Sequence, residues 1–165
     1  MLGRDYQSQV CSIARALELV GERWTLLILR DVFLGVRRFD DLQDELGVAR
    51  NVLAARLDRL TENGILERIP YGERPVRYEY GLTDKGRALW PVLVELLQWG
   101  DQYTPNPKGP PTVLRHIGCG GTLGRDRKCT RCGSLLEYGQ TRAEPGPGAP
   151  PDHPLLRRKE QVASL

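Results

Sequence analysis

The chain has 165 residues, of which 24 are basic and 21 acidic, for a formal net charge of +3. This length suits one compact domain with an appendage, or two small domains. No stretch is long and apolar enough to cross a bilayer, and the first residues lack the apolar segment of a signal peptide. We therefore expect a cytoplasmic protein with no membrane partner. Its four cysteines are then expected to be reduced or metal-bound rather than joined in disulfides.

Composition changes near residue 104. Residues 1–104 carry 14 basic and 16 acidic residues with 12 glycines and prolines, whereas 105–165 carry 10 basic, 5 acidic and 18 glycines and prolines. A slightly acidic folded domain (1–104) is therefore expected before a basic, turn-rich segment. We divide that segment into a linker at 105–113, a small module at 114–140 and a disordered basic tail at 141–165.

Helical periodicity dominates the first domain. Four helices are predicted, at about 10–20, 22–33, 40–46 and 49–63, with a short extended piece at 37–39. The pattern then alternates with period two at 65–69 and 77–80, which predicts two antiparallel strands around an exposed turn. A last helix runs from a cap at Thr83 to about Tyr103. This mainly α fold with a small β-hairpin, in the α+β class, is a winged helix-turn-helix.

Short motifs through this domain point to one family. They are Cys11, Gly21-Glu22-Arg23-Trp24-Thr25, Arg38-Phe39 with Leu42, Leu53 with Arg56-Leu57 and Leu60, Asn63-Gly64-Ile65-Leu66, the run from Tyr78 to Gly86, and Trp99-Gly100. In combination they resemble the HxlR-type winged helix family of bacterial transcription regulators, which is related to the MarR group. The resemblance covers residues 9–103 and implies a dimeric DNA-binding regulator that usually acts near its own promoter.

The fourth helix carries the predicted base-reading residues, because the second helix of a helix-turn-helix enters the major groove by its N-terminal part. If Leu53 faces the core, Asn51, Val52 and Ala55 point outward, and Arg50 lies in the first turn. Arginine suits guanine and asparagine suits adenine, whereas valine and alanine contact thymine methyl groups. We therefore expect Arg50 and Asn51 to read bases in double-stranded DNA.

Phosphate contacts are expected from the flank of the same helix and from the wing. Arg56 lies on that flank, and Arg74 and Arg77 lie in or next to the turn between the two strands. These arginines would contact phosphates or, in the wing, the neighbouring minor groove. The net charge of −2 on residues 1–104 argues against strong non-specific binding. Affinity would then depend on a few arginines or on the basic tail.

The last helix is apolar almost all round, whereas a helix at the rim of a small domain needs only one buried stripe. The second apolar face is therefore expected to meet another subunit in a homodimer, and Pro91 to kink or split the helix. In the alternative arrangement, residues 105–140 fold back over that face.

Metal-ligand spacing marks the small module. His116-x2-Cys119 is followed after nine residues by Cys129-x2-Cys132, a spacing that supplies the four ligands of a closed structural Zn²⁺ site. The module therefore reads as zinc-ribbon-like, with His153 outside the ligand set. Two alternatives stay open: plain reduced thiols in a disordered tail, or a redox pair of Cys129 and Cys132.

A closed site leaves no coordination position for metal catalysis, and no catalytic constellation is present elsewhere, so a non-enzyme is expected. The leading hypothesis is a homodimeric transcription regulator, a repressor that binds a pseudo-palindromic operator and responds to a small-molecule or redox effector. The alternative is a winged-helix adaptor whose ribbon docks a partner protein.

Cys11 is a possible redox sensor. In the family that the sequence resembles, a cysteine at this position senses electrophiles or oxidants in some members and is structural in others. A helix N-terminus lowers the pKa of a thiol, and Arg15 one turn away could stabilise the thiolate. Burial against Val10 and Ile13 at the dimer contact would instead leave the thiol inert. The sequence leaves both roles open.

Overall fold

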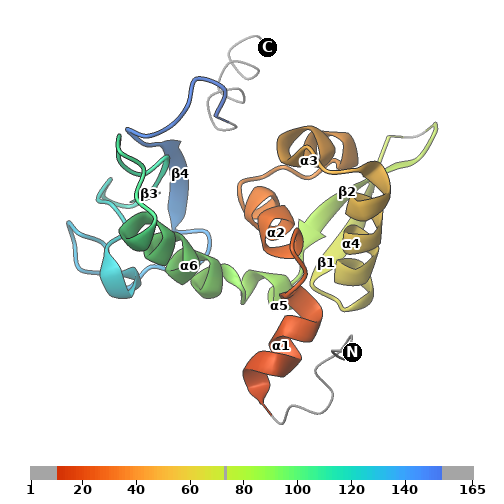
Figure 1. The fold of residues 1–165 in the computed structure, drawn as a ribbon, viewed down its shortest axis with the longest axis horizontal. Helices are drawn as coiled ribbons and strands as arrows, with labels where there is room; N and C mark the ends of the chain where they lie inside the picture. The colour runs from red at the N-terminus through yellow and green to blue at the C-terminus, as the bar shows by residue number, and fades with distance from the viewer. Residues whose placement is uncertain (1–10, 73, 154–165) are drawn as a thin grey trace. The chain divides into compact units, whose positions relative to one another are not determined.

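The computed structural model describes residues 11–72 and 74–153 and divides the chain into two units, residues 1–88 and 89–165. Most of the first unit is helical, and its helices lie beside a two-stranded hairpin (Figure 1). Its elements are α1 (Ser12–Val20), α2 (Thr25–Phe33), α3 (Phe39–Leu46), α4 (Arg50–Glu62), β1 (Leu66–Tyr71), β2 (Arg77–Leu82) and α5 (Asp84–Arg87). This element order confirms the predicted winged helix-turn-helix.

The core of the first unit lies among α2, α3, α4 and the start of the hairpin. Leucines at three- and four-residue spacing on α4 are fully buried, because their stripe faces the other helices. Each such side chain contributes about 1.5–3 kcal/mol to folding when it leaves water. The fully buried apolar side chains here are Ile28, Leu29, Leu42, Leu53, Leu57, Leu60, Ile65 and Leu66.

A three-residue turn separates α3 from α4, as a helix-turn-helix requires. Gly47 ends α3 in the left-handed conformation, with φ of 60°, and its N–H donates to the Gln43 carbonyl at 2.9 Å. Val48 then turns into the core. This buried residue fixes the turn, and α4 begins at Arg50 directly afterwards.

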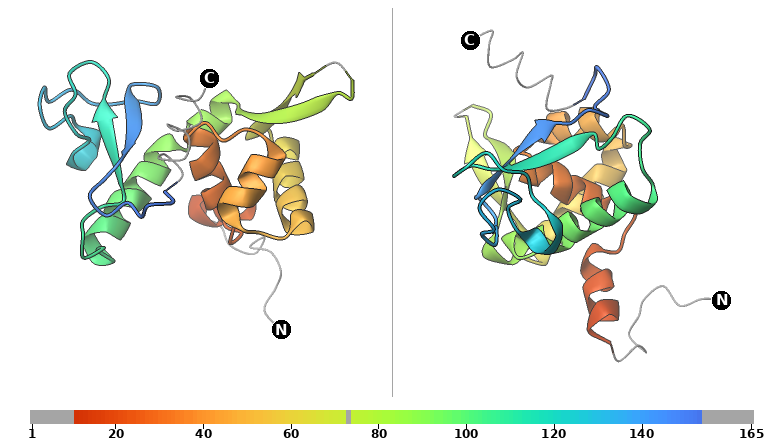
Figure 2. Two further views of the ribbon diagram at one scale, coloured as in Figure 1. Left: turned by 90° about the horizontal axis from the view of Figure 1, so that it is seen from above. Right: turned by 90° about the vertical axis from the view of Figure 1, so that its left-hand side faces the viewer.

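The wing is the β1–β2 hairpin, which projects away from the helices of its unit (Figure 2). The strands pair antiparallel from Leu66 opposite Leu82 to Tyr71 opposite Arg77. The extended piece before α3 joins them as a third short segment, since Arg38 bridges to Glu79. The middle of the hairpin is thereby tied to the N-terminus of α3.

The predicted last helix is split. It forms α5 and, after a short break, α6 (Trp90–Tyr103), which belongs to the second unit. Pro91 lies in the first turn of α6, where a missing N–H costs nothing because that group has no helical acceptor. The expected split at this proline is therefore observed, with the break placed before it.

The second unit contains more ordered structure than the sequence predicts. After α6 it forms β3 (Thr112–His116), the 3-10 turn η1 (Arg125–Arg127) and β4 (Thr141–Pro145), with β3 and β4 antiparallel. The linker expected at 105–113 thus ends inside a strand. The disorder expected from residue 141 is wrong up to residue 153, because 141–145 pair with β3. Residues 154–165 lie outside the described residues.

His153 connects the end of the described chain to the start of β3. Its buried ring lies 3.1 Å from the Thr112 hydroxyl, and Gly146 donates its N–H to the Pro111 carbonyl at 2.9 Å. The segment after β4 therefore folds back along the start of β3. The sequence gives no local sign of this return, because the contacting residues are about 40 positions apart.

None of the helices in residues 11–72 and 74–153 combines the length and apolar character that a membrane span needs.

Thr83 joins the hairpin to α5, and we predict that Thr83→Ala destabilises the first unit. Its hydroxyl oxygen accepts from the Gly86 N–H at 3.1 Å and lies 2.6 Å from the Gly64 carbonyl. Loss of this helix cap should lower the free energy of unfolding by about 1–2 kcal/mol, measured by urea denaturation with circular dichroism.

Thr61→Ala is the matched control, because the Thr61 hydroxyl donates only to the Leu57 carbonyl within its own helix. Its removal is expected to cost less than about 0.5 kcal/mol. Equal losses for the two variants would contradict the role of Thr83 as a cap.

Candidate functional site

The N-terminal half of α4 presents the side chains predicted to read bases. Arg50, Asn51 and Ala55 are exposed and Val52 is half-buried, as expected when the buried leucines face the opposite side. The structure thus places these four residues on one accessible face.

Arg50 rests against α3. Its guanidinium lies 4.6 Å from the centre of the Phe39 ring, 3.3 Å from the Asp40 carboxylate and 3.5 Å from the Gln43 amide oxygen. The side chain remains 70% exposed, so this ion pair contributes at most about 1 kcal/mol. Such a weak pair can be exchanged for a base or phosphate at small cost.

Arg56, for which a phosphate contact is predicted, is already paired within the chain. Only 24% of its side chain is exposed, and its guanidinium donates to the Glu22 carboxylate at 2.8 Å. Its Nε is buried and has no hydrogen-bond partner among the described residues. Arg56 therefore links α4 to the segment before α2. A phosphate contact would require it to leave that carboxylate.

The wing supplies exposed cations. Arg74 and Arg77 are both exposed, at the turn and at the start of β2. Sequence reasoning missed Arg38, whose guanidinium stacks 4.9 Å above the Tyr71 ring and lines an open hollow of about 510 Å³ with Arg50 and Arg77. The Arg38-Phe39 pair at the start of α3 is the sequence feature that could have indicated this position, but the motif by itself indicates only the family.

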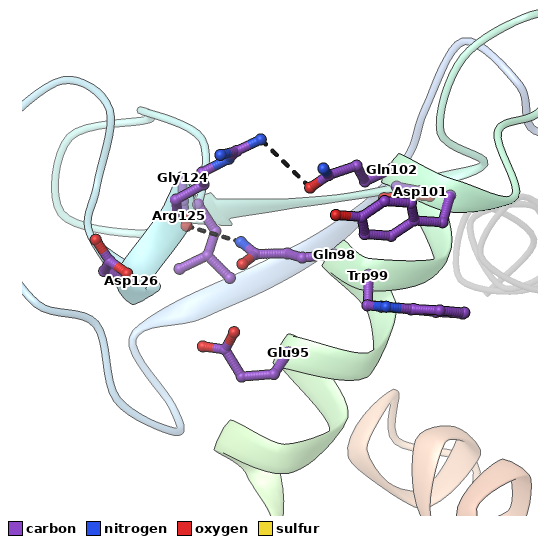
Figure 3. A pocket seen from close by; sticks show the side chains of 10 residues that line it. Glu95, Gln98, Trp99, Asp101, Gln102, Gly124, Arg125 and Asp126 are labelled. Atoms are coloured by element: carbon purple, nitrogen blue, oxygen red, sulfur yellow. Dashed lines mark hydrogen bonds between the residues drawn. The ribbon is translucent and has the colours of Figure 1, made fainter.

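Helix α6 keeps an exposed apolar face, and the homodimer contact predicted for this helix stays a prediction. The module covers a neighbouring face: Gln98 donates to the Gly124 carbonyl at 2.7 Å, and Arg125 donates to the Gln102 amide oxygen at 3.3 Å (Figure 3). Part of the segment 105–140 thus folds back onto α6, as in the alternative arrangement. It covers the face with Gln98 and Gln102 and leaves the apolar face exposed. The large apolar side chains that remain exposed on α6 are Val92, Leu96, Trp99 and Tyr103.

The four predicted metal ligands gather at one point. The ligand atoms of His116, Cys119, Cys129 and Cys132 all lie within 4.8 Å of one another. The His116 Nδ1 lies 3.3 Å from the Cys119 sulfur and 3.4 Å from the Cys132 sulfur, and the Cys119 and Cys129 sulfurs are 3.4 Å apart. The structure therefore brings together a set of one imidazole and three thiols that could hold a metal ion.

Two equivalent turns hold this cluster. Gly120 donates its N–H to the His116 carbonyl at 2.8 Å, and Gly133 donates to the Cys129 carbonyl at 2.9 Å. Both glycines have a φ of 73°, which favours residues without a Cβ. Each ligand pair and the glycine after it thus form the same knuckle.

The surroundings of the cluster favour the thiolate at Cys129 and Cys132, whereas the neighbouring Cys129 sulfur raises the pKa of the Cys119 thiol. Hydrogen bonding with the Ser134 hydroxyl and with the Ser134 backbone lowers the pKa of the Cys132 thiol to about 6. The backbone N–H of Cys132 lowers the pKa of Cys129, and the Cys129 sulfur raises the pKa of the His116 imidazole. A Cβ on Gly121 would lie 2.6 Å from the Cys129 sulfur, so only glycine fits against the cluster.

Cys11 is exposed directly before α1. The backbone N–H groups of Ala14 and Ile13 lower the pKa of its thiol. Arg15 donates to the Ser12 hydroxyl at 3.1 Å. The expected thiolate stabilisation therefore comes from the helix start rather than from the guanidinium. The alternative, burial of Cys11 at a dimer contact with Val10 and Ile13, stays open, because Val10 lies outside the described residues.

Comparison with known proteins identifies the family. The HxlR-like helix-turn-helix profile matches residues 19–108, more than half of the chain. The chain belongs to this family. This HxlR-like protein is 52% identical over 137 residues to Rv3095 of Mycobacterium tuberculosis, an uncharacterized HTH-type transcriptional regulator, which covers 83% of this chain and 87% of the relative.

Two solved structures extend the comparison. The proposed transcription factor PA1607 is 40% identical with a TM-score of 0.57, over 86% of this chain and 88% of its own. The redox regulator HypR in its oxidized form is 26% identical with a TM-score of 0.52, over 56% of this chain and 96% of its own. The family and these relatives are transcription regulators rather than enzymes, which confirms the expected DNA-binding class.

Cys11 provides a prediction about reactivity. Because the thiolate is the nucleophile and the pKa of Cys11 is lowered, its alkylation by iodoacetamide at pH 7 should be several-fold faster in the folded protein than in the urea-unfolded chain. Mass spectrometry of the Cys11 peptide measures the rate, with the unfolded chain as internal control. An equal or slower rate in the folded protein would contradict the prediction.

Proposed function

We propose that this HxlR-like protein is a homodimeric transcriptional repressor that binds a pseudo-palindromic operator. The observation that carries the proposal is the exposed start of α4, where Arg50 and Asn51 lie on an accessible face beside a projecting wing. Arg50 and Asn51 read bases, Val52 and Ala55 contact thymine methyl groups, and Arg74 and Arg77 hold the backbone. Arg56 contributes mainly by fixing α4 to Glu22.

A second copy of the chain is the proposed partner of the exposed α6 face. Trp99 and Tyr103 stack with ring centres 5.4 Å apart on a surface that also exposes Val92 and Leu96. Aromatic and aliphatic side chains of this kind dominate the buried centre of subunit interfaces. Two copies related by a two-fold axis would present two recognition helices to successive major grooves, about 34 Å apart.

Zn²⁺ is the proposed occupant of the cysteine and histidine cluster. In a tetrahedral site with metal–ligand distances of about 2.0–2.3 Å, neighbouring ligand atoms lie roughly 3.3–3.8 Å apart. Three of the ligand–ligand separations are 3.3–3.4 Å, and all four ligand atoms lie within 4.8 Å of one another, which supports a site of this size. Three thiolates and one imidazole fill all four positions, so the metal is structural.

A redox effector is proposed to act through Cys11, which is exposed and has a lowered thiol pKa. HypR, which shares the fold at 26% identity, is itself a redox regulator. In two copies of the chain, the only partner outside the metal cluster for a Cys11 disulfide is the other Cys11, since the remaining cysteines are zinc ligands.

The DNA-binding proposal predicts a sequence-dependent loss in Arg50→Ala. Removal of a bidentate base contact should weaken binding to the protein's own upstream DNA by about 1–3 kcal/mol, with little change on scrambled DNA. Fluorescence anisotropy at fixed salt measures both affinities.

Arg59→Ala is the matched control, because Arg59 lies on the same helix but pairs with Glu18. Its affinity for DNA is expected to stay near that of the wild type. A loss in Arg50→Ala that is the same on both DNAs would show that Arg50 does not read bases.

The zinc proposal predicts one metal ion per chain and its loss in Cys129→Ser. Because only few apolar residues are buried in this module, removal of a ligand should also expose its backbone to hydrogen exchange at 114–138. Elemental analysis and exchange mass spectrometry measure the two effects. Cys11→Ser is the control and should keep the metal, whereas wild-type protein purified without chelators and found metal-free would refute the proposal.

A further inference from the structure

Several arginines and tyrosines gather between the start of α3 and the wing, and among them Arg38 has been given no role above. An open hollow of about 510 Å³ lies between the start of α3 and the hairpin, and Arg38, Arg50, Arg77, Tyr71 and Tyr78 line it. We propose that Arg38, supported by Tyr71 and Arg77, binds a phosphate of the DNA backbone in this hollow. The inference rests on the proposed DNA-binding function and adds a contact to it.

Arg38 is held in place without neutralisation of its charge. Its guanidinium stacks 4.9 Å above the Tyr71 ring, and within residues 11–72 and 74–153 it forms no ion pair with a carboxylate. The neighbouring Arg37 pairs with Glu79 at 3.7 Å. Stacking orients the planar guanidinium and leaves its N–H groups for a phosphate.

Arg77 adds a second cation. It lies opposite Tyr71 in the hairpin register, so both side chains belong to the same end of the wing. Arg77 is exposed and forms no ion pair with another described residue. Arginine and tyrosine side chains are among the groups that contact DNA phosphates, and both kinds line this hollow.

The carboxylates of the hollow leave a positive balance. Asp40 and Asp41 also line it, and Asp40 pairs with Arg50 at 3.3 Å. Asp41 is then the one remaining carboxylate of the lining beside the two cations Arg38 and Arg77. The side chains that line the hollow therefore carry a net charge of +1, which favours an anion. Because Arg50 lines the same hollow, a phosphate bound there would belong to the DNA that Arg50 reads.

The experiment compares Arg38→Ala with Arg37→Ala, which removes the same charge one residue away. Binding to upstream and scrambled duplexes is measured over a range of salt concentrations. Arg38→Ala should weaken binding to both duplexes about tenfold and reduce the salt slope by about one, since one phosphate contact is lost. Arg37→Ala should change the affinity less than about threefold.

Tyr71→Leu is a second variant, which removes the ring on which Arg38 stacks and leaves both arginines. It should weaken binding to the two duplexes alike, by a smaller factor. The Arg38 backbone keeps its bonds in all variants, because its carbonyl accepts from the Leu42 N–H at 3.0 Å regardless of the side chain. Thermal unfolding by circular dichroism checks this.

Three results would overturn the inference. In the first, Arg38→Ala binds like Arg37→Ala while Arg50→Ala loses sequence-specific affinity; this leaves the proposed function intact. In the second, wild-type protein binds inorganic phosphate alone saturably at constant ionic strength and Arg38→Ala does not, which would assign the hollow to a free anion. In the third, folded wild-type protein binds neither duplex, and the proposed function fails as well.

Discussion

The burial of one leucine stripe on α4 is the constraint on which the DNA-binding face depends. Leu53, Leu57 and Leu60 are almost completely removed from water, and turning the helix about its axis would expose them at a cost of about 1.5–3 kcal/mol each. The rotation of α4 is thereby fixed, and Arg50 and Asn51 must face outward. The ion pair of Arg56 with Glu22 fixes the same helix from its flank.

The second unit is organised by a different constraint. Between residues 105 and 153 only Cys129 and Leu136 are buried among the apolar side chains described, which is too little to form a stable core. Two knuckles with the same glycine conformation bring four ligands together instead. A metal ion at this point would supply the cross-link that an apolar core supplies elsewhere. The hydrogen bond from Gln98 to Gly124 then connects the loop between the knuckles to α6.

Sequence patterns predicted the elements that depend on residues close together in the chain. They did not predict contacts between residues that are far apart in the chain. The helices, the hairpin and the ligand spacing were all predictable from periodicity and short motifs. The strand at Thr141–Pro145 was missed because its composition resembles a loop and its partner lies about 30 residues earlier. The ion pair between Arg56 and Glu22 was missed for the same reason, since 34 positions separate the two residues. Winding a helix shows which residues face outward but does not show which of them are already paired.

That pairing also explains how a domain with a net charge of −2 can bind a polyanion. Many arginines of the first unit are neutralised by carboxylates: Arg30 by Asp31, Arg37 by Glu79, Arg56 by Glu22, Arg59 by Glu18, Arg68 by Asp58 and Arg87 by Asp84. Arg38, Arg74 and Arg77 form no such pair within the described residues and lie on or beside the hairpin. The potential at the wing is therefore more positive than the net charge indicates. Because few cations contribute, affinity must come from well-placed contacts, and each of them should account for a measurable part of the salt dependence.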